Sequence, residues 1–160
     1  MNQTGTYVNI MRESLERKRK YLTEILKLTN EQSVIAAAEK FDEERFSEIV
    51  EKKDVLIDNI NEIDKGFSSV YDRVRIEIQQ NPSAYRDKLL AIQELIRACV
   101  DLGVQIEAVE ERNRATMEQV FSAKFQGVRQ VKQSKNVANK YYKSMENGMV
   151  NDSLLYDKKK

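Results

Sequence analysis

Apolar residues recur at alternating spacings of three and four along the first half of the chain, which is the spacing of one face of an amphipathic helix. In the first stretch, the apolar row consists of Val8, Met11, Leu15, Leu22, Ile25 and Leu26. In the second stretch, it consists of Phe46, Ile49, Leu56, Ile60, Ile63, Phe67, Val70 and Val74. Asp42 precedes the second row as a candidate N-cap, and Glu43 and Glu44 follow it, where acidic side chains favour the start of a helix. The two rows predict helices over about residues 5–40 and about residues 43–80.

A third row begins after the only proline of the chain. We interpret Asn81 and Pro82 as the N-cap and the first helical position, because a missing N–H has no cost there and the proline ring ends the preceding helix. The row consists of Tyr85, Leu89, Ile92, Ile96, Cys99, Gly103, Ile106, Glu110, Asn113, Met117 and Val120. It predicts a helix over about residues 82–133. Residues 134–160 are polar and poor in periodicity, and we expect a tail that is partly helical or disordered.

The three predicted helices indicate an all-α protein. None of them can bury its apolar row alone, and their connections are short, so we expect an antiparallel bundle of three long helices with coiled-coil-like packing. Residues 1–133 would form this single domain, and residues 134–160 would follow it as a C-terminal tail. A third helix that ends near residue 133 would be roughly 75 Å long and would extend past the other two.

Lys53 interrupts the apolar row of the second helix. If the following turn is centred near Asn81 and Pro82, the antiparallel register places Lys53 opposite Glu110, which interrupts the row of the third helix. The two would form a structural polar pair that specifies register and adds little net stability, because desolvation cancels much of their attraction. The alternatives are that Lys53 lies at the edge of the row and extends its ammonium group to water, or that it contacts a partner.

The composition narrows the chemistry that is available. The chain has no histidine and one cysteine, so it lacks the commonest general base near neutral pH, the imidazole metal ligand and any disulfide within one chain. No phosphate-binding glycine loop or nucleophile elbow occurs. We therefore expect no enzyme activity, no catalytic residues, no cofactor and no metal. Cys99 is interpreted as a small buried apolar side chain, and Glu110 with Asn113 is too small a ligand set for a metal.

Neither a membrane span nor a signal peptide is indicated. The longest uninterrupted apolar run is VIAAA, residues 34–38, whereas a membrane helix needs roughly 20 such residues. The N-terminal sequence MNQTGTYVNIMRESLERKRK lacks the apolar segment of a signal peptide. These features predict a cytoplasmic protein that does not insert into a membrane.

Charge is balanced in total and uneven along the chain. The 27 Lys and Arg residues nearly equal the 26 Asp and Glu residues, so no global field favours nucleic acid. Residues 31–64 contain eleven acidic and four basic residues, whereas residues 124–160 contain nine basic and three acidic residues. The run RKRK at residues 17–20 is interpreted as a solvated face, because four consecutive helical residues point around more than one side.

The sequence YVNIMRESLERKRKYLTEILKLTNEQSVIAAAEKFDEERFSEIVEKKDVLIDNINEID, at residues 7–64, resembles the family of FlgN-type flagellar export chaperones. The shared pattern within it consists of Ile49, Val50, Lys53, Leu56, Ile57, Ile60, Ile63 and Asp64. The later sequence IEAVEERNRATME, at residues 106–118, and the tail sequences NKYYKSM and DSLLYDKKK are similar to clostridial-type members. The resemblance covers nearly the whole chain.

The resemblance implies a function without catalysis. Such chaperones bind the amphipathic C-terminal helices of hook-filament junction proteins, which are the hook-associated proteins, prevent their premature assembly, and deliver them to the flagellar export gate. A C-terminal tyrosine is linked to docking at the gate in the family, and Tyr141 and Tyr142 are both candidates here. The alternative is a non-enzymatic coiled-coil adaptor or a nucleic-acid-associated helical protein, which the basic tail and the RKRK run would serve.

We expect the client to bind where the third helix outruns its neighbours, beyond about residue 119. The candidate partner-binding residues are Val120, Phe121, Phe125, Val128, Val131, Tyr141, Tyr142 and Met145. Lys124, Arg129 and Lys132 would flank them and steer an acidic client helix. The alternatives are that the chain bends back at Gly127, or that two protomers cover each other in a homodimer.

Overall fold

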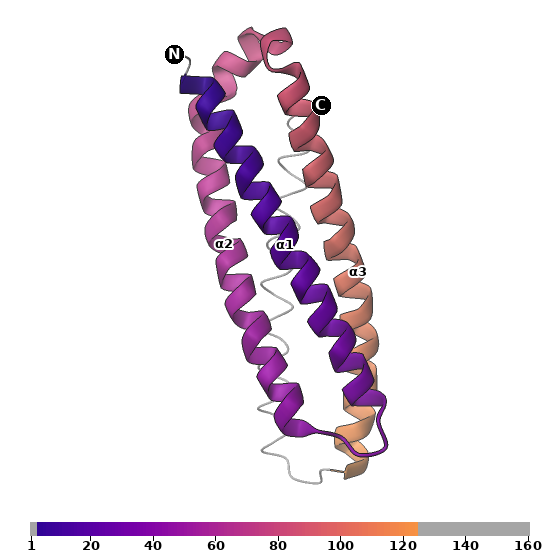
Figure 1. Ribbon diagram of the computed structural model, residues 1–160. Helices are drawn as coiled ribbons and strands as arrows, with labels where there is room; N and C mark the ends of the chain where they lie inside the picture. Colours follow the sequence, from indigo (N-terminus) through magenta and orange to yellow (C-terminus); the bar gives the residue numbers. More distant parts are fainter. Residues whose placement is uncertain (1–2, 125–160) are drawn as a thin grey trace.

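The computed structural model describes residues 3–124, which form three long α-helices and one turn of 3₁₀-helix. α1 comprises Gln3–Ala37, α2 Glu43–Gln80, η1 Pro82–Ala84 and α3 Arg86–Lys124. α1 and α3 run in the same direction and α2 runs opposite to both (Figure 1). Residues 3–124 contain no strand. The expected all-α bundle of three long antiparallel helices is therefore confirmed, while the expected tail at residues 134–160 lies outside the described residues.

The connection between α1 and α2 depends on a side-chain cap. Oδ1 of Asp42 accepts a hydrogen bond from the backbone N–H of Arg45 at 3.0 Å, which satisfies one of the free donors at the start of α2. Glu43 and Glu44 lie in the first turn, where the helix dipole favours negative charge. α1 ends at Ala37, a few residues before the expected end near Lys40, because residues 38–40 bend toward α2.

The turn between α2 and α3 differs from the expectation. The backbone N–H of Asn81 still bonds to the carbonyl of Glu77 at 3.0 Å, so Asn81 closes α2, and its side chain makes no capping bond to the following turn. Pro82 starts the short η1 helix, and α3 begins only at Arg86. The interruption falls at Tyr85, which is buried and whose hydroxyl donates to Oε1 of Glu77 at 3.1 Å. Anchoring Tyr85 against α2 turns the chain before the long helix starts.

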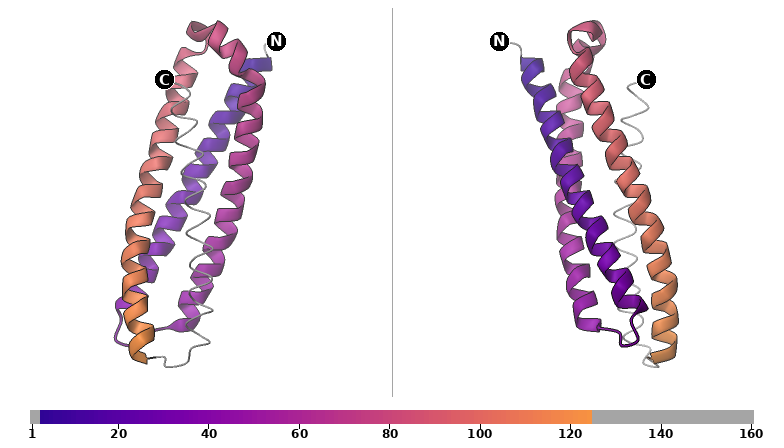
Figure 2. Two further views of the ribbon diagram at one scale, coloured as in Figure 1. Left: turned by 180° about the vertical axis from the view of Figure 1, so that it is seen from behind. Right: turned by 45° about the vertical axis from the view of Figure 1, so that its right-hand side comes forward.

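α1 lies between the other two helices. It packs closely along both α2 and α3, whereas α2 and α3 do not pack closely against each other along their lengths. Figure 2 shows this arrangement from behind, with α2 and α3 apart and α1 beyond them. The alignment of the second and third helices therefore depends mainly on α1, which supplies the principal contacts of both.

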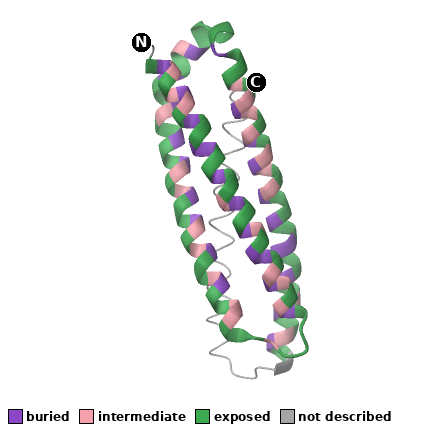
Figure 3. Cartoon of the chain, in the orientation of Figure 1, coloured by how far each residue is buried: buried purple, intermediate pink, exposed green. Residues whose placement is uncertain are grey.

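Each helix buries one stripe of residues along the inside of the bundle (Figure 3). The buried apolar residues form three clusters. The upper cluster, near the α2–α3 turn, contains Val8, Met11, Leu15, Phe67, Tyr71, Val74, Ile78, Tyr85, Ile92 and Ile96. The middle cluster contains Leu22, Ile25, Ile57, Ile60, Cys99 and Ile106. The lower cluster contains Ala36, Met117 and Phe121.

The buried row of α2 is rotated slightly from the expected one. Ile57, Asp64 and Tyr71 are buried, whereas their neighbours Leu56, Ile63 and Val70 are only half-buried. The apolar spacing favoured the second set because Asp64 and Tyr71 are poor matches to an apolar pattern. Tertiary packing selects the first set, since those positions face the inside of the bundle.

Candidate functional site

The lower end of α3 is where we expected an uncovered client surface to begin. Phe121 instead is buried in the lower cluster, where it packs with Ala36 and Met117. Its ring meets the ring of Phe41 edge-on, with 5.8 Å between centroids, and Phe41 lies 5.5 Å from the ring of Phe46. The expectation for Phe121 is therefore corrected: the connection between α1 and α2 folds over the end of α3 and covers this side chain.

The other candidate partner-binding residues divide at the end of the described chain. Val120 is half-buried, so part of its side chain faces solvent beside the covered Phe121. The remaining candidates lie outside the described residues; they are Phe125, Val128, Val131, Tyr141, Tyr142 and Met145. Any client surface formed by these candidates therefore starts beside the lower cluster.

Lys53 and Glu110 meet inside the bundle. The ammonium group of Lys53 donates a hydrogen bond to Oε1 of Glu110 and forms an ion pair with it. The side chains are 2% and 8% exposed, so the alternative in which Lys53 lies at the edge of its row and extends its ammonium group to water is wrong. The antiparallel register thus brings together the two residues that interrupt their apolar rows. Because α2 and α3 are not in close contact, the two long side chains bridge the space between them.

Polar side chains of α1 complete a layer around this pair. Lys53 also donates to Oε1 of Gln32, and the hydroxyl of Thr29 lies 3.2 Å from Oε1 of Glu110. Nδ2 of Asn113 donates to the backbone carbonyl of Thr29 at 3.1 Å, which ties α3 to α1 at the same level. We call Thr29, Gln32, Lys53, Glu110 and Asn113 the lower polar layer. It separates the middle apolar cluster from the lower one.

Burial sets the electrostatics of this layer. Removal of the ammonium group from water lowers the pKa of Lys53 below its ordinary value of 10.5, and the adjacent carboxylate of Glu110 opposes that shift. The pair loses hydration on both sides, so its attraction contributes little net stability while its geometry disfavours other registers. The arrangement assigns these residues to specifying how the helices align.

A second buried ion pair lies between the upper and middle clusters, and the sequence analysis missed it. Nζ of Lys18 is 2.8 Å from Oδ1 of Asp64, and the Lys18 side chain is 2% exposed. The signal was present, because Lys18 continues the three-and-four spacing between Leu15 and Leu22. The interpretation of RKRK as one solvated face is therefore wrong at Lys18, although the other three residues of that run are exposed.

The described helices offer no sign of a metal centre or a membrane span. Within residues 3–124, no cluster of three or more acidic or cysteine side chains is arranged to hold a metal ion. In the same part of the chain, no helix combines the length and apolar character that crossing a membrane requires. Asn113, considered with Glu110 for a metal, instead bonds to α1, and its Oδ1 accepts from the hydroxyl of Ser33 at 2.6 Å.

Comparison with known proteins yields no match to this chain among protein-family models, curated proteins or solved structures.

Proposed function

We propose that this protein is a non-enzymatic flagellar export chaperone that binds the C-terminal helices of hook-associated proteins, prevents their premature assembly and delivers them to the export gate. The resemblance at residues 7–64 motivates this proposal. Several residues of that pattern are buried structural positions here, namely Ile49, Lys53, Ile57, Ile60 and Asp64. The pattern therefore coincides with the residues that specify the bundle, and client binding is assigned to a different part of the chain.

The observation that carries the assignment lies at the lower end of α3. Phe121 is enclosed by the α1–α2 connection, while Val120 next to it is half-buried. An amphipathic client helix needs an apolar strip about two to three turns long, and the side chains that follow in sequence provide one at helical spacing: Phe125, Val128 and Val131. In this proposal the bundle is the scaffold, residues beyond Phe121 hold the client, and Tyr141 or Tyr142 contacts the gate.

Binding can be tested with matched aspartate substitutions in the full chain. The protein is co-expressed with C-terminal helical segments of hook-associated proteins, and the complexes are isolated by size exclusion and titrated. Val128→Asp is expected to weaken binding at least about tenfold, because a charge would enter an apolar contact. Val104→Asp is the control, since Val104 is a 52% exposed apolar residue of α3 far from the candidate surface, and it is expected to bind within about twofold of the parent.

Two outcomes would contradict the proposal. One is the absence of any complex with hook-associated segments when the parent chain is folded. The other is equal loss of binding in both variants, which would place the client on the bundle itself. A salt-sensitive shift of DNA by the parent protein would favour the nucleic-acid-associated alternative instead. Burial of Lys18 weighs against that alternative, because it removes one of four charges from the RKRK run.

A further inference from the structure

The three helices occupy three corners of a four-cornered arrangement. In a closed three-helix coiled coil each helix packs against both others, whereas in a four-helix bundle the diagonal helices do not touch. Here α1 packs along α2 and α3, and those two do not pack closely on each other. α2 and α3 are therefore diagonal, and the corner opposite α1 is not filled by any element within residues 3–124. We call this the α2–α3 side.

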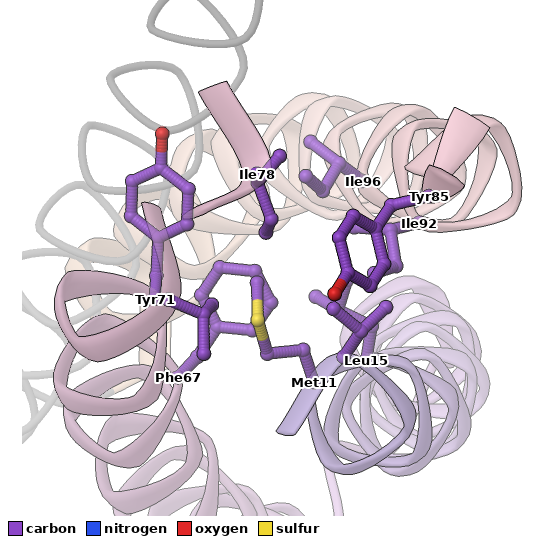
Figure 4. Close-up of a cluster of buried hydrophobic side chains, with 10 residues drawn as sticks. Met11, Leu15, Phe67, Tyr71, Ile78, Tyr85, Ile92 and Ile96 are labelled. Carbon is purple, nitrogen blue, oxygen red and sulfur yellow. The ribbon is translucent and has the colours of Figure 1, made fainter. Parts of the chain in front are cut away.

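α2 directs a stripe of mostly apolar side chains toward the inside of the bundle. On one flank of α2, the hydroxyl of Thr4 in α1 donates to Glu77, and the guanidinium of Arg73 lies 6.0 Å from the ring of Tyr7. Tyr71 lies on the inward stripe of α2 in the upper cluster, and Figure 4 shows its ring directed away from Met11 of α1. Ile78 lies about two turns after Tyr71 and Ile57 about four turns before it on the same stripe, and both are buried. The same stripe includes Asp64, which pairs with Lys18 of α1, so it faces the inside of the bundle, where α1 and an element at the opposite corner would both contact it.

We propose that residues 128–149 of this same chain fill that corner as an amphipathic helix antiparallel to α3. The segment follows α3 directly, so a reversal near the lower end of the bundle would direct it up along the α2–α3 side. A helix over residues 128–149 would be roughly 33 Å long, which is more than half of the roughly 57 Å of α2. The segment is therefore long enough to cover the lower and middle parts of this side without a partner.

The spacing of the segment suits a buried row. Positions at alternating intervals of three and four run through Val128, Val131, Lys135, Ala138, Tyr142, Met145 and Met149. Apolar residues are fewer in this row than in the rows of α1, α2 and α3, which is why we described residues 134–160 as poor in periodicity. One lysine interrupts the row, as Lys18 and Lys53 interrupt the rows of α1 and α2, where each forms a buried ion pair.

Charge distribution favours the same placement. Residues 125–145 contain five basic and no acidic residues, whereas residues 43–64, the lower half of α2, contain eight acidic and three basic residues. A reversal after α3 brings the basic segment to that acidic half, and attraction between opposite charges favours this orientation over the reverse one. The docking does not depend on the proposed function. If both hold, Val128, Val131, Tyr142 and Met145 must leave the bundle before they contact a client.

Distances between spin labels in the full chain test the docking. Cysteines are introduced in pairs into a Cys99→Ala background that retains its helical circular dichroism. One label is placed by Ser144→Cys and the other by Thr23→Cys, Asn59→Cys or Gln105→Cys. These three partners are exposed residues of α1, α2 and α3. The registers that pair Lys18 with Asp64 and Lys53 with Glu110 place them at about one level of the bundle.

The expected result is three narrow distance distributions, with the label on α1 farthest from Ser144. Helix axes about 10 Å apart on the sides of a square are about 14 Å apart on the diagonal, so the distance to Thr23 should exceed the other two by about 4 Å or more. A shortest distance to Thr23, or broad distributions to all three partners, would overturn the proposal. Loss of the short distances on dilution with unlabelled protein would also overturn it, because a second copy would then fill the corner.

A pair of variants separates docking from mere proximity. Met145→Asp places a charge on the inward row, and it is expected to broaden the distances and to speed amide hydrogen exchange in α2 at least about tenfold. Asn147→Asp adds the same carboxylate two residues away, off the row, and should change neither measurement. Equal effects of the two variants, or no effect of Met145→Asp, would show that this row does not face the bundle.

Discussion

Replacement of Lys53 and Glu110, singly and together, measures the energetics of the lower polar layer. The perturbations are Lys53→Met, Glu110→Met and the double variant, in which both positions become unbranched apolar side chains. In Lys53→Met, the Glu110 carboxylate stays in an 8% exposed position beside the Thr29 hydroxyl, and Gln32 loses a donor. Breaking a buried ion pair costs about 3–5 kcal/mol, against a total stability of about 5–15 kcal/mol for a typical domain.

The double variant should behave differently from the sum of the single ones. With both charges removed, no uncompensated charge remains, and apolar replacement of a buried pair is commonly neutral or stabilising. The orphaned Gln32 retains a cost of about 1–3 kcal/mol, so we expect the double variant within about 2 kcal/mol of the parent. The resulting coupling energy is at least about 4 kcal/mol.

Urea unfolding followed by circular dichroism at neutral pH measures each free energy of unfolding. The exposed pair formed by Arg12 and Glu16, 3.7 Å apart, provides the control, and Arg12→Met should cost less than about 1 kcal/mol. If each single replacement in the layer also costs less than about 1 kcal/mol and the two costs add, the charges are solvated in solution. The reasoning from burial would then be refuted.

Three further results are expected. Lys18→Met should lower the free energy of unfolding by about 3–5 kcal/mol, because it removes the cation of a buried ion pair, whereas the exposed neighbour Arg17→Met should stay within about 0.5 kcal/mol. Similar effects of the two variants in urea unfolding would contradict burial of Lys18. Phe121→Ala should lower the free energy of unfolding by about 3 kcal/mol in the same assay, and Phe121→Leu by distinctly less, since leucine keeps the lower cluster filled. A decrease below about 0.5 kcal/mol for Phe121→Ala would show that Phe121 is uncovered in solution. Burial lowers the pKa of Lys53 in the folded state, so the unfolded chain binds more protons between that lowered value and 10.5. The stability of the parent relative to Lys53→Met should therefore rise with pH across this interval. A stability difference that falls with pH would contradict the direction of the pKa shift.

The helices and their order followed from local chemistry alone. Alternating spacings of three and four, the capping side chain of Asp42 and the single proline determine where long helices start and stop, because those signals act within a few residues. The Lys53–Glu110 pair could also be predicted from the sequence, since one turn position defines an antiparallel register along two regular helices. The Lys18–Asp64 pair could have been predicted by the same register argument. The basic neighbours of Lys18 instead favoured the interpretation that this side chain faces solvent.

Which helix lies between the other two was decided only in three dimensions. An apolar row shows that a face is buried, yet Ile57 and Leu56 differ by one position, and the choice between them depends on where α1 lies. The cover over Phe121 comes from the connection near Phe41, which has no periodicity from which its path could be inferred. Helix periodicity is set by the backbone of each segment, whereas the pairing of faces and the path of a short loop are set by contacts between segments far apart in sequence.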